Sequence, residues 1–145
     1  MQIENTLRIH APAAKVWDAL TNPAETKKYM FGCEALSDWK PGSPLVWKGV
    51  FNGVEMIAVK GHLVDIRPKA FLAYTTFDPN SKMEDKAENY LTVTYALQED
   101  NGYTTLTVTQ GDYDKVAEGK RRYDESVAGG GWMPILEAIK KIVEG

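Results

Sequence analysis

The chain has 145 residues, of which 43% are hydrophobic and 26% are charged, and its formal net charge is −3 at pH 7. This balance is typical of a folded domain and argues against a disordered chain, a collagen-like repeat or a coiled coil. A domain of this length buries roughly 68% of the surface that its unfolded chain exposes. We therefore expect one domain over residues 1–145, and the lack of a basic excess argues against nucleic acid as a main partner.

The cysteine content and the apolar runs predict the compartment. Cys33 is the single cysteine, so an internal disulfide is impossible, which favours a reducing environment. The first ten residues alternate between polar and apolar side chains, unlike a secretory signal. The longest uncharged, apolar-leaning run, residues 126–136, is well short of the roughly 20 residues that cross a bilayer. We expect a cytoplasmic protein without membrane insertion.

The N-terminal third predicts one strand and two abutting short helices. Alternating apolar residues indicate a strand from about residue 2 to residue 10, with one slip at Asn5. Asn22 is a favourable cap and Pro23 a favourable first residue for the second helix. The first helix follows Pro12, because one face would carry Ala13, Val16, Trp17 and Leu20.

Two Asn-Gly pairs, at residues 52–53 and 101–102, predict two-residue hairpin turns, since these residues readily adopt the positive φ angles of a type I′ turn. In the second hairpin, Tyr95 would face Val108 and Leu97 would face Leu106. The first hairpin would place Phe51 opposite Val54, Trp47 opposite Ala58 and Leu45 opposite Lys60. The inner face of the first hairpin would then carry Leu45, Trp47, Phe51, Val54, Met56 and Ala58.

The position of His62 depends on that first register. Continued along the strand, the register places His62 on the inner face with Val64 and Ile66, where it could line a cavity or act as a general base. Lys60 would share this face, which is unfavourable in a core. Gly61 could therefore mark a bulge that turns both side chains differently, leaving a half-exposed or hydrogen-bonded histidine as the alternative.

The remainder of the chain predicts one more strand, a long loop and a C-terminal helix. Residues 70–77 are rich in aromatic and β-branched residues, and the polar residues 78–89 connect them to the next strand. A charged segment follows the second hairpin. The last helix either kinks near residues 130–134 or begins there, because Pro134 is unfavourable inside a helix. Its apolar face would carry Trp132, Leu136, Ile139 and Val143.

The order of elements is thus β-α-α-β(6)-α, and four segments make a resemblance specific. These are KVWDALTNP at 15–23, SDWKPGSPLVWKG at 37–49, EDKAENY at 84–90, and Trp132-x-x-x-Leu136. With them, the chain resembles bacterial proteins related to the C-terminal domain of the activator of the ninety-kilodalton heat-shock protein ATPase. Those proteins belong to the START-like, or SRPBCC, helix-grip superfamily. The resemblance implies a single START-like domain of the α+β class, with a curved antiparallel sheet wrapped around a long C-terminal helix and an apolar cavity.

No familiar catalytic motif is present, and no carboxylates cluster in sequence near the two histidines. We therefore expect no metal and no cofactor, and the sequence favours a binding protein over an enzyme. Aromatic and apolar side chains on the predicted inner faces are the candidate ligand-binding residues, with plain core packing as the alternative. These candidates are Tyr29, Trp47, Met56, His62, Tyr74, Tyr95, Trp132 and Leu136.

Three functions remain open at this point. The first is binding of a small apolar or amphipathic ligand. The second, implied only by the resemblance, is a stress-related protein that associates with a chaperone; we discount ATPase activation because the expected single domain leaves no anchoring domain. The third is a cyclase-like enzyme that acts on an aromatic or polyketide substrate through His62 and a tyrosine. A monomer or a homodimer is compatible with each.

Overall fold

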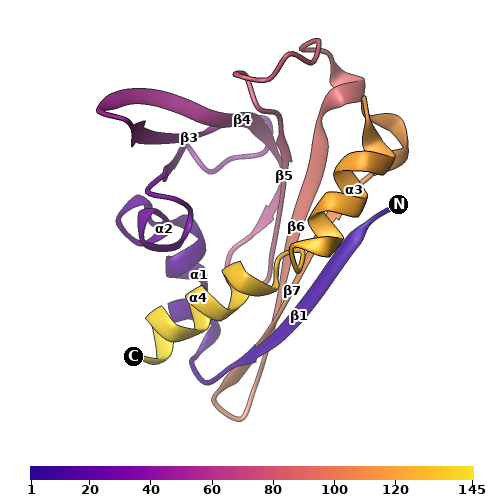
Figure 1. Cartoon of the computed structure of the whole chain (residues 1–145). Coiled ribbons are helices and arrows are strands. Elements are labelled where there is room, and N and C mark those ends of the chain that lie inside the picture. The colour runs from indigo at the N-terminus through magenta and orange to yellow at the C-terminus, as the bar shows by residue number, and fades with distance from the viewer.

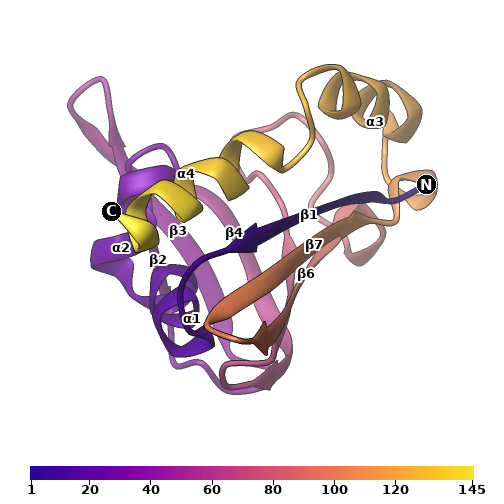
Figure 2. The same ribbon diagram turned by 90° about the horizontal axis from the view of Figure 1, so that it is seen from below.

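Seven antiparallel strands form the sheet of this computed structural model, which describes residues 1–145, in the order β1-β7-β6-β5-β4-β3-β2. The strands are β1 (Ile3–Ile9), β2 (Glu34–Ser37), β3 (Pro44–Phe51), β4 (Val54–Arg67), β5 (Phe71–Thr76), β6 (Leu91–Asp100) and β7 (Tyr103–Gly111). The helices are α1 (Ala13–Thr21), α2 (Pro23–Tyr29), α3 (Gly119–Ala128) and α4 (Met133–Glu144). The sheet curves around α4, which lies across one of its faces (Figure 1 and Figure 2). The predicted α+β helix-grip fold is confirmed.

Both predicted hairpin turns are present. Asn52 and Gly53 have φ angles of 53° and 78°, and the turn at Asn101 and Gly102 has 51° and 83°. In the second hairpin Tyr95 pairs with Val108 and Leu97 with Leu106, as expected. These four side chains are buried and give β6 and β7 one continuous apolar face.

The register of the first hairpin is correct only near its turn. Phe51 faces Val54, but a bulge at Trp47/Lys48 leaves Ala58 without a partner and shifts all later pairs by one residue. Trp47 therefore faces Val59 instead of Ala58, and Leu45 faces Gly61 instead of Lys60. Because side chains alternate between the faces of a strand, this shift moves every later residue of β4 to the other face.

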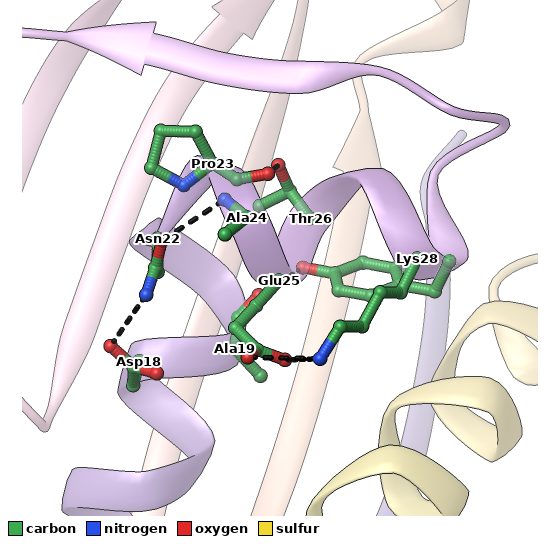
Figure 3. A network of polar contacts seen from close by, with 9 residues as sticks. Asp18, Ala19, Asn22, Pro23, Ala24, Glu25, Thr26 and Lys28 are labelled. Carbon is green, nitrogen blue, oxygen red and sulfur yellow. Dashed lines mark hydrogen bonds and ion pairs between the residues drawn. The ribbon is translucent and has the colours of Figure 1, made fainter.

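The junction of α1 and α2 places the second helix against the start of the sheet (Figure 3). The Asn22 side chain accepts a hydrogen bond from the backbone N–H of Ala24 at 3.0 Å, as its sequence position predicts. Thr26, which is fully buried, donates to the carbonyl of Cys33 at 3.1 Å and accepts from the N–H of Ala35 at 3.0 Å. These bonds tie α2 to β2 and hold the connecting residues 30–33 beside the inner face.

Two helices, not one, follow the last strand. The charged segment forms α3, and three glycines separate it from α4, which begins at Met133 with Pro134 in its first turn. Proline is tolerated there because the first N–H groups of a helix have no partner within the helix. Leu136, Ile139 and Val143 are buried against the sheet and α1. None of the helices is long and apolar enough to span a membrane.

Candidate functional site

A cavity of about 480 Å³ lies between the inner face of the sheet and the helices α3 and α4. Twenty residues line it, and fourteen of them are hydrophobic. The hydrophobic ones are Ile3, Met30, Phe31, Cys33, Trp47, Phe51, Ala58, Val59, Tyr74, Phe77, Leu91, Val93, Trp132 and Ile135. The other six are Thr76, Asp78, Gln110, Arg122, Ser126 and Gly131. A volume of this size is in the range of ligand pockets, and the walls are mainly apolar.

Trp132 joins the sheet to the start of α4 and is fixed at both ends. Its backbone N–H donates to Oδ1 of Asn5 on β1, and its indole Nε1–H donates to Oε1 of Gln110 on β7, each at 2.9 Å. Its ring packs edge-on against Tyr95 with the centroids 5.9 Å apart. Because the backbone N–H and the indole N–H of Trp132 are both hydrogen-bonded, the indole forms a fixed wall of the cavity.

Two buried tyrosine hydroxyls meet behind the cavity. The hydroxyl oxygens of Tyr74 and Tyr95 are 2.7 Å apart, and both side chains are almost fully buried. Burial raises the pKa of both phenols, so both are neutral at physiological pH. One of the two hydroxyls donates its hydrogen to the other, and the accepting hydroxyl keeps its own hydrogen free to donate. Of the two tyrosines, only Tyr74 lines the cavity.

The eight predicted site residues separate into three groups. Trp47, Tyr74 and Trp132 line the cavity. Tyr29, Tyr95 and Leu136 are buried in the core but do not line it, and the Tyr29 hydroxyl donates to the carbonyl of Ala19 at 2.7 Å. The last two, Met56 and His62, do not line the cavity: Met56 is half-buried close to the turn of the first hairpin, and His62 is exposed.

The expectation that His62 lies on the inner face is wrong. The bulge in β4 turns Leu63 inward, where it is 1% exposed, and leaves His62 on the outer face. There the Nδ1 atom of His62 lies 3.1 Å from Oγ1 of Thr75, in a polar hollow that Lys60 and Asp85 also line. The alternative of a hydrogen-bonded histidine describes this site, but the bulge lies at Ala58 and Gly61 is regularly paired with Leu45. A proton-transfer role for His62 in the cavity therefore has no structural basis.

The sequence did not indicate the polar residues of the cavity. Gln110 follows Leu106 and Val108 at intervals of two, so its inward direction could have been read from the alternation in β7. Arg122 and Ser126 lie one turn apart on α3, in a segment whose charged composition gives no apolar face to orient it. No group of three or more His, Cys, Asp or Glu side chains is arranged to hold a metal ion.

The curved sheet, the C-terminal helix that crosses it and the cavity between them define a START-like, helix-grip protein. Residues 10–144 match the family model described as "Activator of Hsp90 ATPase homolog 1-like protein", and the chain belongs to this family. No functionally curated protein matches the chain.

Solved structures agree with this assignment. A protein from Cytophaga hutchinsonii, solved in solution, is 35% identical, with a TM-score of 0.76 over 99% of this chain and 94% of that one. Two more distant structures show the same fold. An HSP90 activator from Plasmodium falciparum has 18% identity, a TM-score of 0.69 and coverage of 99% and 96%, and an Aha1 dimer from Colwellia psychrerythraea has 16%, 0.72 and the same coverage.

Proposed function

We propose that the protein binds a small, mainly apolar molecule in the cavity between the sheet and α4. The observation that carries this proposal is the cavity itself, with about 480 Å³ of space and fourteen hydrophobic residues among its twenty. An interior of this size is normally filled by side chains at close-packed density. Leaving it open forfeits packing contacts, and a ligand that fills it would recover them while removing its own apolar surface from water.

The proposal is tested with a neutral apolar fluorophore, N-phenyl-1-naphthylamine, and two variants of α3. Ser126 lines the cavity, whereas Ala128 on the same helix is exposed and does not line it. Ser126→Phe should reduce probe affinity about tenfold or more by occupying the space, and Ala128→Phe should leave it unchanged. Equal affinity in all three proteins, or no binding by the unaltered protein, would contradict the proposal.

A second candidate function is association with a chaperone, and an exposed apolar edge favours it. Val50 and Val54, beside the turn of the first hairpin, are 64% and 61% exposed, and Phe31 is 78% exposed. The hairpin projects from the body of the molecule beside α2 (Figure 1). Val50 and Val54 belong to adjacent cross-strand pairs and face opposite sides of the hairpin, so its end exposes apolar surface on both sides, as interaction sites do.

This second function is tested by measuring binding to a ninety-kilodalton heat-shock protein. Val50→Asp with Val54→Asp should abolish such binding. Val64→Asp is the matched control, because Val64 is 49% exposed on the same strand as Val54 but lies away from the turn. If the control weakens binding as much as the double variant, the hairpin turn is not the contact surface.

A further inference from the structure

Arg122 is the one basic residue that lines the cavity, and most N–H groups of its guanidinium make no hydrogen bond within the chain. Its Nη1 atom donates to Sδ of Met83 at 3.3 Å and to the carbonyl of Ala117 at 3.4 Å, a weak acceptor and a long bond. Its Nε and Nη2 atoms make no hydrogen bond within the chain, and no carboxylate forms an ion pair with it. Arginine presents five N–H donors in a planar fork, so most of this capacity is unused.

The adjacent arginine, Arg121, differs in that two carboxylates bind its guanidinium. Arg121 pairs with Glu118 through Nη2 at 2.9 Å and with Glu125 through Nη1 at 3.0 Å, and it does not line the cavity. The pKa of Glu118 is lowered, mainly by the hydrogen bond from Arg121. The positive charge of Arg122 makes a smaller contribution to this lowering. Glu118 is therefore already engaged by Arg121.

The other polar residues of the cavity also offer donors. The indole N–H of Trp132 can only donate, so Gln110 must turn its oxygen toward it and its NH₂ group away. That NH₂ group and the Ser126 hydroxyl make no hydrogen bond within the chain, and no fully buried side-chain polar atom lacks a partner. These donors are therefore accessible from the cavity or from solvent.

The single acidic residue in the lining is differently placed. Asp78 lies in the loop after β5, is exposed, and accepts a hydrogen bond from the backbone N–H of Asn80 at 2.8 Å. Its carboxylate thus stabilises its own turn, whereas Arg122 is half-buried and its one local contact is the long bond to the carbonyl of Ala117. The balance of available polar groups favours a ligand that brings acceptors and negative charge.

We infer that the ligand of this cavity is an amphipathic anion, whose acidic head is bound by Arg122 and whose apolar body fills the space between the sheet and α4. This inference rests on the proposed function and adds the chemical class of the ligand. An arginine fork matches a carboxylate or phosphate oxygen pair, and such charge-assisted bonds are about twice as strong as neutral ones. The apolar walls supply affinity, and the arginine supplies selection for the head group.

The test compares three ten-carbon probes, decanoate, decan-1-ol and decylamine, in displacing N-phenyl-1-naphthylamine at pH 7. The unaltered protein should bind decanoate about tenfold more tightly than the alcohol, and the amine most weakly. Arg122→Gln should remove the preference for decanoate over decanol. Arg121→Gln is the matched control on the same helix and should retain it. Decyl phosphate, as a fourth probe, separates a carboxylate-specific site from a general anion site.

The outcomes distinguish failure of the anion preference from failure of the apolar site. If decanoate and decanol bind equally well to the unaltered protein, the inference fails while the proposed apolar site stands. If the amine binds best, Asp78 holds the head group and the assignment to Arg122 is wrong. If none of the probes displaces the fluorophore, the apolar site itself is wrong. Loss of the preference in both arginine variants would show a general surface charge effect instead of a contact with Arg122.

Discussion

Oδ1 of Asn5 accepts a hydrogen bond from the backbone N–H of Trp132 at 2.9 Å. This bond joins the first strand to the residue directly before α4, 127 positions later in the chain. Asn5 occupies an inward position of β1, between Ile3 and Leu7, where an apolar residue would be expected. A helix leaves its first N–H groups without internal partners. The asparagine that interrupts the apolar alternation is thus the side chain that satisfies the start of α4.

Asn5→Ala should therefore destabilise the protein by about 1–2 kcal/mol, because it leaves the Trp132 N–H without its acceptor. The measurement is the free energy of unfolding in urea. Glu4→Ala is the control, since Glu4 is exposed on the same strand, and it should change stability by no more than about 0.5 kcal/mol. Equal effects of the two substitutions would mean that the bond to Trp132 contributes nothing.

The hydroxyl pair of Tyr74 and Tyr95 predicts an asymmetric double-mutant cycle. Tyr74→Phe leaves the hydroxyl of Tyr95 buried with no partner and should cost about 1–3 kcal/mol. Tyr95→Phe should cost less, because Tyr74 lines the cavity and water there can replace the lost partner of its hydroxyl. The double variant should lose less stability than the sum of the two single ones. Strict additivity in urea unfolding would contradict a direct bond between the hydroxyls.

The ion pair between Lys60 and Asp85, on the outer face of the sheet, predicts that stability depends on pH. The hydrogen bond from Lys60, followed by that from Tyr90, lowers the pKa of Asp85 below its ordinary value of 3.8. A lowered pKa stabilises the fold above pH 3.8, and this contribution disappears as the pH falls through the lowered value. For Lys60 the sign is opposite: Asp85 raises its pKa above 10.5, so its contribution is lost as the pH rises through the raised value.

Carboxyl NMR titration of Asp85 checks this prediction in the unaltered protein and in Lys60→Met. Removal of the ammonium group should move the pKa of Asp85 upward toward 3.8, while the hydrogen bond from Tyr90 keeps it somewhat below that value. Both side chains are partly exposed, so we expect only a small change in stability. An unchanged pKa of Asp85 in Lys60→Met would show that the pair does not form in solution.

Trp132 should contribute to both the core and the cavity. Its indole is 9% exposed, and the cavity leaves one side of the ring without partner atoms. Trp132→Ala should therefore cost about 3 kcal/mol, the lower end of the range for a large core aromatic, and should also weaken binding of an aromatic probe. Trp17→Ala is the control: Trp17 is half-buried and does not line the cavity, so it should reduce stability without changing probe affinity.

Local chemistry explains which parts of the fold were predictable. The Asn-Gly turns and the cap at Asn22 depend on neighbouring residues, and the structure has them where the sequence indicated. The bulge at Ala58 depends on the partner strand, and no residue in β4 identified its position in advance. One unpaired residue then reversed the assigned face of His62.

The cavity was predictable only in its aromatic wall. Trp47, Tyr74 and Trp132 lie on elements whose apolar alternation or helical spacing gave their direction. Arg122 is on α3, which is stabilised along its exposed surface by i,i+4 ion pairs such as Lys120–Asp124 and offers little apolar patterning. Its guanidinium contacts Met83, 39 residues earlier in the chain, and no local pattern encodes this contact.

The most direct test of ligand binding in the cavity uses the four tryptophans as internal probes. Trp47 and Trp132 line the cavity, whereas Trp17 and Trp39 pack against the core elsewhere. In a titration with N-phenyl-1-naphthylamine followed by ¹⁵N NMR, the indole signals of Trp47 and Trp132 should shift in a saturable way, and those of Trp17 and Trp39 should not. Shifts confined to Trp17 or Trp39, or the absence of any saturable shift, would contradict binding in this cavity.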